Sequence, residues 1–350
     1  MNGWIVAGLG AAALAPLYAW AFVFLPRERW QILATLPVAR REDGEWRGVN
    51  LTWYGLLIGC AMAAGTALAL LLAGAANRPL AYPALALILL LGVSVPAASV
   101  VNRIVEGHWH GFTVGGAAFA GMSIGPWLLW LTNRWLFPES AEMETWLMVG
   151  ALAPAYALGE GIGRLACISF GCCYGRRLDA CPRWMQRLFA RGHFVFRGAL
   201  KKAAVESDCE GVPLVPIQAV TAILSSLAGL IGMALFLNGR LAGAFAVPIL
   251  VTQLWRFFSE FLRADYRGGG RVSAYQRMAA LAALAAGITW LLAPGAAGEP
   301  LSVAAGLRLL WTPGAMLLVQ AVGWLGFLRM GVSSVTAARI RLIGTKPTVA

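Results

Sequence analysis

The sequence predicts an all-α protein that crosses a membrane several times. Its residues are 59% hydrophobic and only 13% charged, whereas soluble globular domains carry about 25% charged residues. The mean hydropathy is +0.69, and the apolar residues form blocks of about 20, the length that an α-helix needs to cross the hydrocarbon core. The alternating pattern of a membrane β-barrel is missing from the sequence. Together these observations indicate a polytopic helical membrane protein.

About nine apolar blocks are long enough to be spans. The first follows no basic segment and precedes Pro26-Arg27-Glu28-Arg29, so we predict no cleavable signal peptide. Segment 26–50 contains five arginines, four acids and two tryptophans, which fits either an interfacial helix at headgroup depth or a plain linker. The spans are expected at 3–25, 51–74, 79–101, 111–132, 145–168, 214–238, 241–262, 274–293 and 308–330.

Positive charge is concentrated on one side of this arrangement. The net charge is +12, with 25 arginines and three lysines. Counting residues near span ends, 22 Lys/Arg lie on the side that holds the soluble loop 176–213, and four lie on the other. The positive-inside rule therefore places this loop in the cytoplasm. The basic residues alternate with spans and form no continuous soluble face, so nucleic-acid binding is not expected.

The stretch Gly159 to Gly175 predicts a site within the membrane. It has five glycines, and it places Glu160 and Arg164 four residues apart on one helical face. Charge at membrane depth is costly and usually functional, and glycine permits a close approach of the backbone to a ligand. The same stretch ends with the adjacent cysteines Cys172 and Cys173.

Arg256 and Glu260 repeat the four-residue spacing in the seventh span. Each Glu–Arg pair is either a self-contained ion pair or part of an anion site that both arginines form. Two such pairs inside spans favour the anion site. The guanidinium fork fits phosphate oxygens, so phosphate is the anion that we expect.

Other candidates are single residues. Tyr54, after Trp53 at a span entrance, is either an interfacial anchor or a hydroxyl donor to a headgroup. Gln218 is a polar group near the mouth of the sixth span. His108 and His110 are two residues apart but have no further clustered ligands, so we expect a general base rather than a metal. The sequence predicts neither a metal site nor a cofactor.

The six cysteines do not follow a zinc pattern such as CxxC…CxxC. Cys60 and Cys167 are expected in helices as small apolar residues. Cys181 and Cys209 lie in the long loop, where they are able to pair in an oxidising compartment. Cys172 and Cys173 are too close in sequence for an easy mutual disulfide.

Five motifs occur in an order and spacing that resemble the bacterial prolipoprotein diacylglyceryl transferase family. The resemblance covers about 51–293, leaving 1–50 as an extra N-terminal span with its linker and 294–350 as an extra C-terminal span with a basic tail. A seven-helix core is implied, and Gly-Cys-Cys-Tyr-Gly marks a divergent branch. The motifs are Trp53-Tyr54-Gly55-Leu56, Gly115-Gly116 after Phe112-Thr113, Gly163-Arg164-Leu165 with Gly171 and Gly175, Pro216-x-Gln218, and Arg256-x-x-x-Glu260-Phe261-x-Arg263.

The resemblance implies transfer of the diacylglyceryl group of phosphatidylglycerol to a lipoprotein lipobox cysteine, with release of glycerol 1-phosphate, in the bacterial inner membrane. By the same resemblance, Arg164 and Arg256 handle the phosphate and are expected to be catalytic. We also expect His110 and Tyr54 to be catalytic, as replacements for a base that the family has and this sequence lacks. The expected substrate-binding residues are Glu160, Gly163, Gly115, Gly116, Cys172, Cys173, Gly175, Gln218, Glu260 and Arg263.

Several positions depart from the family pattern. Val114 replaces the family's histidine, Cys172 replaces an acid and Cys167 an asparagine, and Ala219-Val220-Thr221 stands where the family has Leu-Tyr-Glu. The donor-side arginines are retained, so the donor is expected to be an anionic phospholipid while the acceptor is open. His110, His108, Tyr54 or a Cys172 thiolate is the candidate replacement base.

The sequence leaves both the orientation and the function open. The family topology places the long loop outside the cytoplasm, against the charge count; we favour the family orientation, and a cytoplasm-facing relative is the alternative. The function is either the transferase or a lipid-binding or transport protein without catalysis. A third hypothesis is a thiol–quinone redox protein that uses Cys172 and Cys173 with Cys181 or Cys209.

Overall fold

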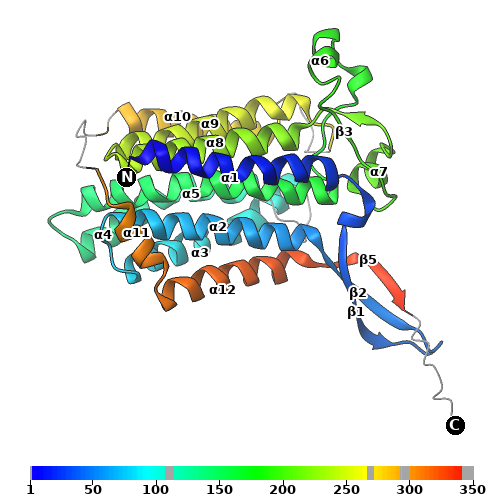
Figure 1. The fold of residues 1–350 in the computed structure, drawn as a ribbon, viewed down its shortest axis with the longest axis horizontal. Helices are drawn as coiled ribbons and strands as arrows, with labels where there is room; N and C mark the ends of the chain where they lie inside the picture. Colours follow the sequence, from blue (N-terminus) through cyan, green and yellow to red (C-terminus); the bar gives the residue numbers. More distant parts are fainter. Residues whose placement is uncertain (1, 107–113, 266–271, 292, 294–299, 341–350) are drawn as a thin grey trace.

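The computed structural model describes residues 2–106, 114–265, 272–291, 293 and 300–340, most of which form long helices that lie side by side (Figure 1). In these residues every predicted span corresponds to a long helix. Six helices (α1, α2, α3, α8, α9 and α12) meet the length and hydropathy expected of a span, which confirms a polytopic membrane protein. The long helices are α1 (Gly3–Phe24), α2 (Trp53–Ala75), α3 (Ala81–Glu106), α4 (Val114–Leu136), α5 (Ala141–Phe170), α8 (Ile217–Leu237), α9 (Leu241–Ser259), α10 (Ala274–Leu291) and α12 (Pro313–Gly331).

The predicted span 308–330 covers the end of one helix and nearly all of a second. α11 (Val303–Leu310) ends before Trp311, and Thr312 then caps α12 by accepting a hydrogen bond from the amide of Ala315. Threonine is a favoured N-cap because its hydroxyl satisfies a free amide at the helix start. The pattern of apolar residues alone does not reveal this break.

Small residues bring α5 close to α2 and α8. A Cβ added to Gly161 of α5 would lie 2.1 Å from Oγ of Ser226 in α8, and one added to Gly65 of α2 would lie 3.0 Å from the carbonyl oxygen of Ala155. Such contacts are typical of membrane helices, where packing rather than hydrophobic burial drives association. α5 is therefore held tightly along both neighbours.

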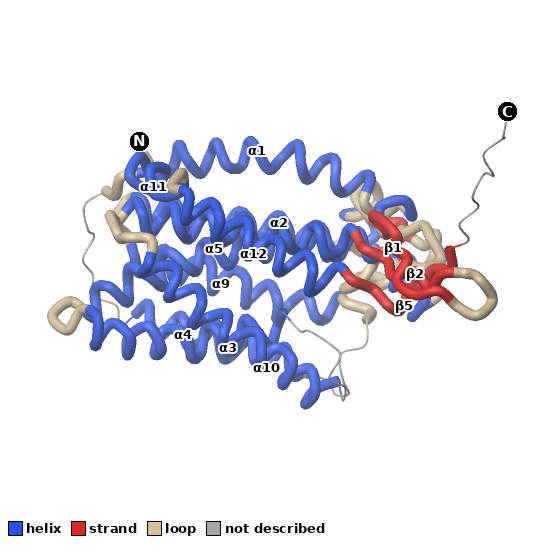
Figure 2. The backbone as a smooth tube through the Cα atoms, turned by 90° about the horizontal axis from the view of Figure 1, so that it is seen from below, coloured by secondary structure: helices blue, strands red, loops and turns tan. Residues whose placement is uncertain are grey.

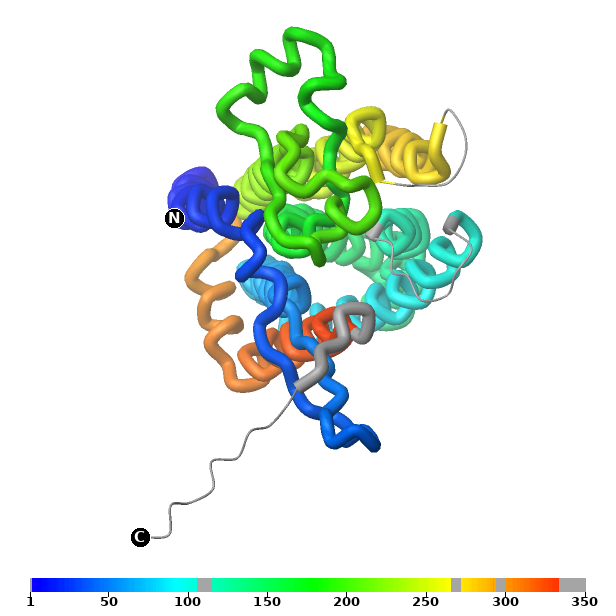
Figure 3. The backbone as a smooth tube through the Cα atoms, turned by 90° about the vertical axis from the view of Figure 1, so that its right-hand side faces the viewer, coloured from blue at the N-terminus to red at the C-terminus, as the bar shows by residue number. Residues whose placement is uncertain are grey.

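The two ends of the chain flank the same core. α1 packs against α8, and α12 packs against α2, as the view along the bundle shows (Figure 3). Gly55 of α2 and Gly331 of α12 touch through their backbones, since an added Cβ on Gly55 would lie 2.1 Å from Cα of Gly331.

Residues 26–50 form neither an interfacial helix nor a plain linker. After a short 3-10 helix, η1 (Glu28–Trp30), they form β1 (Ile32–Arg40) and most of β2 (Trp46–Thr52). β5 (Val332–Ile340) adds a third antiparallel strand in the order β1-β2-β5. This small sheet projects beyond the helix ends (Figure 2), and the all-α prediction did not include it.

The long loop lies at the same end of the bundle as the sheet (Figure 1). Lys201, which is fully buried, donates from Nζ to the carbonyl oxygens of Leu25, at 3.1 Å, and Ser169. The loop is thereby fixed over the end of α5, where the predicted site lies. Its elements are η2 (Leu178–Ala180), α6 (Arg183–Leu188), β3 (Phe194–Val195), α7 (Lys202–Ser207) and β4 (Pro213–Leu214).

Candidate functional site

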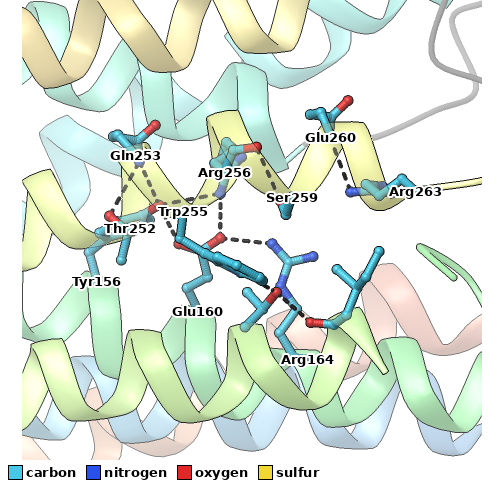
Figure 4. Close-up of polar contacts among 12 residues, drawn as sticks. Tyr156, Glu160, Arg164, Thr252, Gln253, Trp255, Arg256, Ser259, Glu260 and Arg263 are labelled. Atoms are coloured by element: carbon cyan, nitrogen blue, oxygen red, sulfur yellow. Dashed lines mark hydrogen bonds and ion pairs between the residues drawn. The ribbon is translucent and has the colours of Figure 1, made fainter. Parts of the chain in front are cut away.

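One carboxylate bridges two arginines inside the bundle (Figure 4). Arg164 of α5 donates from Nη2 to Oε1 of Glu160 at 2.8 Å, and Nη2 of Arg256 in α9 donates to the same oxygen. The side chains of Glu160, Arg164 and Arg256 are only 4%, 13% and 11% exposed. The predicted Glu160–Arg164 pair is confirmed, and the structure brings Arg256 to it from a second helix.

Tyr156 and Gln253 complete this network, which we call the Arg–Glu–Arg network. The hydroxyl of Tyr156 donates to Oε2 of Glu160 at 2.5 Å, and it accepts from Nε2 of Gln253 at 3.3 Å and Nη2 of Arg256 at 3.4 Å. Sequence reasoning missed both residues. Tyr156 could have been predicted, because it lies four residues before Glu160 and thus on the same helical face.

The network has spare binding capacity for an anion. Two guanidinium groups and one carboxylate carry a formal charge of about +1. The Nε–H groups of Arg164 and Arg256 are buried and have no hydrogen-bond partner among the described residues. Buried donors are nearly always satisfied in native proteins, so each such group requires an explanation. A bound oxyanion with a single negative charge would supply both the acceptors and the missing charge.

The second predicted pair, Arg256 with Glu260, is wrong. The chain tightens into a 3-10 helix, η3 (Glu260–Leu262), at that point, and the Arg256 side chain is directed to α5 (Figure 4). Glu260 instead lies 3.5 Å from Arg263, measured from Oε1 to Nη1, and Arg263 also pairs with Asp265 at 2.6 Å. The four-residue spacing therefore does not identify the partner of Arg256.

Two of the predicted glycines lie against arginines of the site. A Cβ added to Gly115 of α4 would lie 3.1 Å from Nη1 of Arg256 and 2.9 Å from the Tyr275 ring. Gly175 forms an isolated antiparallel bridge with Arg263, and its added Cβ would lie 2.4 Å from the carbonyl oxygen of Val215. At Gly175 the backbone leaves no room for a side chain, whereas at Gly115 a side chain would force Arg256 or Tyr275 to move.

The remaining predicted residues occupy different surroundings. Gly163 faces α2, where its added Cβ would contact Ala61 and Ile58 at 3.7 and 3.8 Å. Gly116 is buried in α4 beside Gly115. Gln218 of α8 donates from Nε2 to the carbonyl oxygen of Cys172 at 2.9 Å, so it supports the cysteine segment. His108 and His110, together with Phe112-Thr113, lie outside the described residues.

Three cysteines gather at the end of α5. The Sγ atoms of Cys167, Cys172 and Cys173 lie within 4.8 Å of one another, so Cys167, which is buried in α5 as expected, also borders two further thiols. Tyr54 at the start of α2 is close enough to interact electrostatically with these cysteines and with Arg164. The structure therefore brings Tyr54 to the site, as predicted.

Cys181 and Cys209 do not pair. All six cysteines lie among the described residues, and each is present as a thiol. Cys181 packs in a hydrophobic cluster with Met185 and Val215, whereas Cys209 belongs to a separate cluster around Tyr174. These separate surroundings do not support the pairing that an oxidising compartment would permit, and neither residue belongs to the group formed by Cys167, Cys172 and Cys173.

A comparison with known families decides the assignment. A model of the prolipoprotein diacylglyceryl transferase family matches residues 45–293, which include the whole Arg–Glu–Arg network and the three cysteines. The chain belongs to this family. The resemblance that the five motifs indicated is thus confirmed, and the match begins slightly before the predicted start of the core at residue 51.

A curated relative agrees with the family match. The chain is 29% identical over 168 residues to phosphatidylglycerol–prolipoprotein diacylglyceryl transferase 2 of Clostridium perfringens (strain 13 / Type A). The aligned segment covers 48% of this chain and 56% of that protein. The chain thus spans little more than half the length of this prolipoprotein diacylglyceryl transferase.

Proposed function

We propose that this protein transfers the diacylglyceryl group of phosphatidylglycerol to the thiol of an acceptor protein and releases glycerol 1-phosphate in the bacterial inner membrane. The observation that carries the proposal is the buried Arg–Glu–Arg network with its two unpartnered Nε–H groups. Phosphatidylglycerol carries one negative charge on a phosphodiester, and this charge complements the network. The name of the Clostridium perfringens relative supports the same donor.

The geometry fits displacement at the glycerol carbon of the donor. The acceptor thiolate forms a C–S bond to this carbon, the C–O bond to phosphate breaks, and its electron pair leaves with glycerol 1-phosphate. Negative charge therefore grows on the phosphate as the bond breaks. Arg164 and Arg256 stabilise this charge in a site of low dielectric constant, and Glu160 holds both guanidinium groups in place before the reaction starts.

The acceptor is a protein or peptide with a reactive cysteine, either a lipobox cysteine or that of a divergent substrate. Tyr54 and His110 remain proposed participants on the acceptor side. Tyr54 is supported by its place near Arg164 and the three cysteines. Glu260, Arg263 and Gly175 support the site by fixing the segment after α9 against the segment after α5.

Purified protein in detergent, given phosphatidylglycerol and a lipobox peptide, tests the proposal. We expect glycerol 1-phosphate and a peptide heavier by one diacylglyceryl group, and neither product when serine replaces the peptide cysteine. Phosphatidylcholine, whose headgroup has no net charge, is the donor control. Binding of phosphatidylglycerol without any glycerol 1-phosphate would instead favour a lipid-binding protein and refute transfer to a lipobox cysteine.

A further inference from the structure

The three cysteines at the end of α5 have the composition of a metal site. Their Sγ atoms lie within 4.8 Å of one another, and a tetrahedral Zn²⁺ with bonds of about 2.3 Å holds its sulfur ligands roughly 3.8 Å apart. Cys167 is 7% exposed, while Cys172 and Cys173 are partly exposed. The three cysteines therefore lie at the edge of the packed interior.

The backbone holds these cysteines together. Gly171 ends α5 with φ +75°, and the amides of Gly171 and Cys172 both donate to the carbonyl oxygen of Cys167, at 2.8 and 3.1 Å. Cys173 has φ +55°, a left-handed conformation that a residue with a side chain rarely adopts. Gln218 fixes the carbonyl of Cys172 from α8. The chain is thus turned back so that all three thiols meet.

Three cationic side chains lie near the cysteines. Arg164 interacts electrostatically with Cys167 and Cys173, Arg263 interacts with Cys173, and Lys202 interacts with Cys172 and Cys173. Three thiolates with one Zn²⁺ carry a net charge of about −1. The neighbouring cations are therefore complementary to the loaded site.

The proposed reaction requires a group that takes the proton of the acceptor thiol. Glu160, Glu260 and Asp265 each pair with an arginine, so these carboxylates are held in ion pairs. A thiol that coordinates Zn²⁺ is deprotonated outright. A metal at the three cysteines would thus deprotonate the acceptor thiol without the help of a carboxylate.

We propose that Cys167, Cys172 and Cys173 bind Zn²⁺ through three thiolates and leave the fourth coordination position for the acceptor thiol. The role given to the fourth coordination position rests on the proposed transferase function. The acceptor thiol loses its proton to solvent as it binds, and its sulfur then attacks the glycerol carbon of the donor. The C–S bond forms, the C–O bond breaks, and the electron pair leaves on glycerol 1-phosphate beside Arg164.

Metal analysis of the full-length protein tests the site without reference to activity. Protein purified in detergent with a reductant is loaded with Zn²⁺, desalted and measured by mass spectrometry of the elements. We expect about one Zn²⁺ per chain. Cys167→Ser, Cys172→Ser and Cys173→Ser should each weaken Zn²⁺ binding by about 10-fold or more. The matched controls Cys60→Ser, Cys181→Ser and Cys209→Ser should bind Zn²⁺ like the parent.

Co²⁺ in place of Zn²⁺ gives a spectroscopic readout of the ligands. Thiolate coordination should produce charge-transfer absorption in wild-type protein that is lost in the three cluster variants. A cysteine peptide should alter this spectrum, and the matched serine peptide should not.

Folded wild-type protein that binds no Zn²⁺, a cluster variant that keeps it, or a disulfide between two of the three cysteines would overturn the site. A normal Co²⁺ spectrum that the cysteine peptide leaves unchanged would overturn the acceptor role alone. Transfer by a metal-free enzyme would refute the metal proposal while leaving the transferase intact. Conversely, Zn²⁺ bound to a protein that releases no glycerol 1-phosphate with the lipobox peptide would support the site and refute transfer to a lipobox cysteine.

Discussion

Arg256 of α9 binds Glu160 of α5, which precedes it by 96 residues, and so ties together two helices of the core. The same carboxylate oxygen accepts a hydrogen bond from Arg164. Because one carboxylate pairs with two guanidinium groups, the network retains a positive charge although its groups are almost completely buried. This arrangement orients both guanidinium groups before any lipid arrives.

Glu160→Gln should abolish most of the activity. The amide keeps the size of the side chain, but it removes the charge that holds two cations side by side, so the guanidinium groups are expected to separate. Loss of this preorganisation should lower the transfer rate by about 100-fold or more. Glycerol 1-phosphate release, with a thermal melt to verify folding, is the measurement. A folded Glu160→Gln protein with wild-type turnover would contradict the role of Glu160.

Tyr156→Phe should weaken the site without removing its charges. It deletes the hydrogen bond to Glu160 and the acceptor for Gln253 and Arg256, and a hydrogen bond to a charged group contributes about 1.5–3 kcal/mol. We expect transfer to fall by about 10-fold. Tyr82→Phe is the matched control, because the Tyr82 hydroxyl binds Asn133 instead. Equal turnover in the two variants would exclude a specific role for the Tyr156 hydroxyl.

Gly115→Ala should displace Arg256. The new methyl group would lie 3.1 Å from Nη1 of Arg256 and 2.9 Å from the Tyr275 ring, so the guanidinium has to move away from α4. A small displacement of a catalytic group can cost up to about 100-fold in rate. Gly92→Ala in α3 meets nothing within 4 Å and should leave transfer unchanged. Unaltered kinetics in Gly115→Ala would show that Arg256 tolerates the shift.

Lys201 should make stability depend on pH. Burial lowers the pKa of its ammonium group to about 7, whereas the unfolded value is about 10.4. Between these values the unfolded chain binds the proton and the folded chain does not, so the free energy of unfolding should rise from about pH 7 to about pH 10.

Thermal melts in detergent from pH 7 to pH 9 check this prediction. Lys201→Met removes the titrating group, so its melting temperature should increase less with pH than that of the parent. Lys202→Met is the neighbouring control, since Lys202 pairs with Glu206, and it should keep the parental slope. Parallel pH curves for Lys201→Met and the parent would rule out the assignment.

Much of the bundle follows from the sequence because apolar blocks and helix length are local properties. The sheet depends on a more distant contact, since β5 pairs with β2 nearly the whole chain away. Its hairpin did have a local signal. Asp43-Gly44 separates the two strands, and Gly44 has the positive φ that a tight turn requires. The many charged residues of segment 26–50 favoured an interfacial helix or a linker over this hairpin.

The contacts of the site that lie within one helix could be predicted from the sequence. Glu160 and Arg164 lie on one face of α5 by spacing alone, whereas the partner of Arg256 comes from another helix and no spacing rule selects it. The cysteine group depends on two residues with positive φ, Gly171 and Cys173. The turn at these residues brings the thiols after α5 back to Cys167, and residue spacing gives no such information.

The most direct test of the account measures glycerol 1-phosphate release from phosphatidylglycerol by Arg164→Gln and Arg256→Gln. Arg240→Gln is the control, because Arg240 is an exposed residue that precedes α9 at the end remote from Arg256. We predict that both network variants fold but lose at least about 100-fold of the transfer rate, while Arg240→Gln retains it. Wild-type release by either folded network variant would contradict the claim that the paired arginines hold the phosphate.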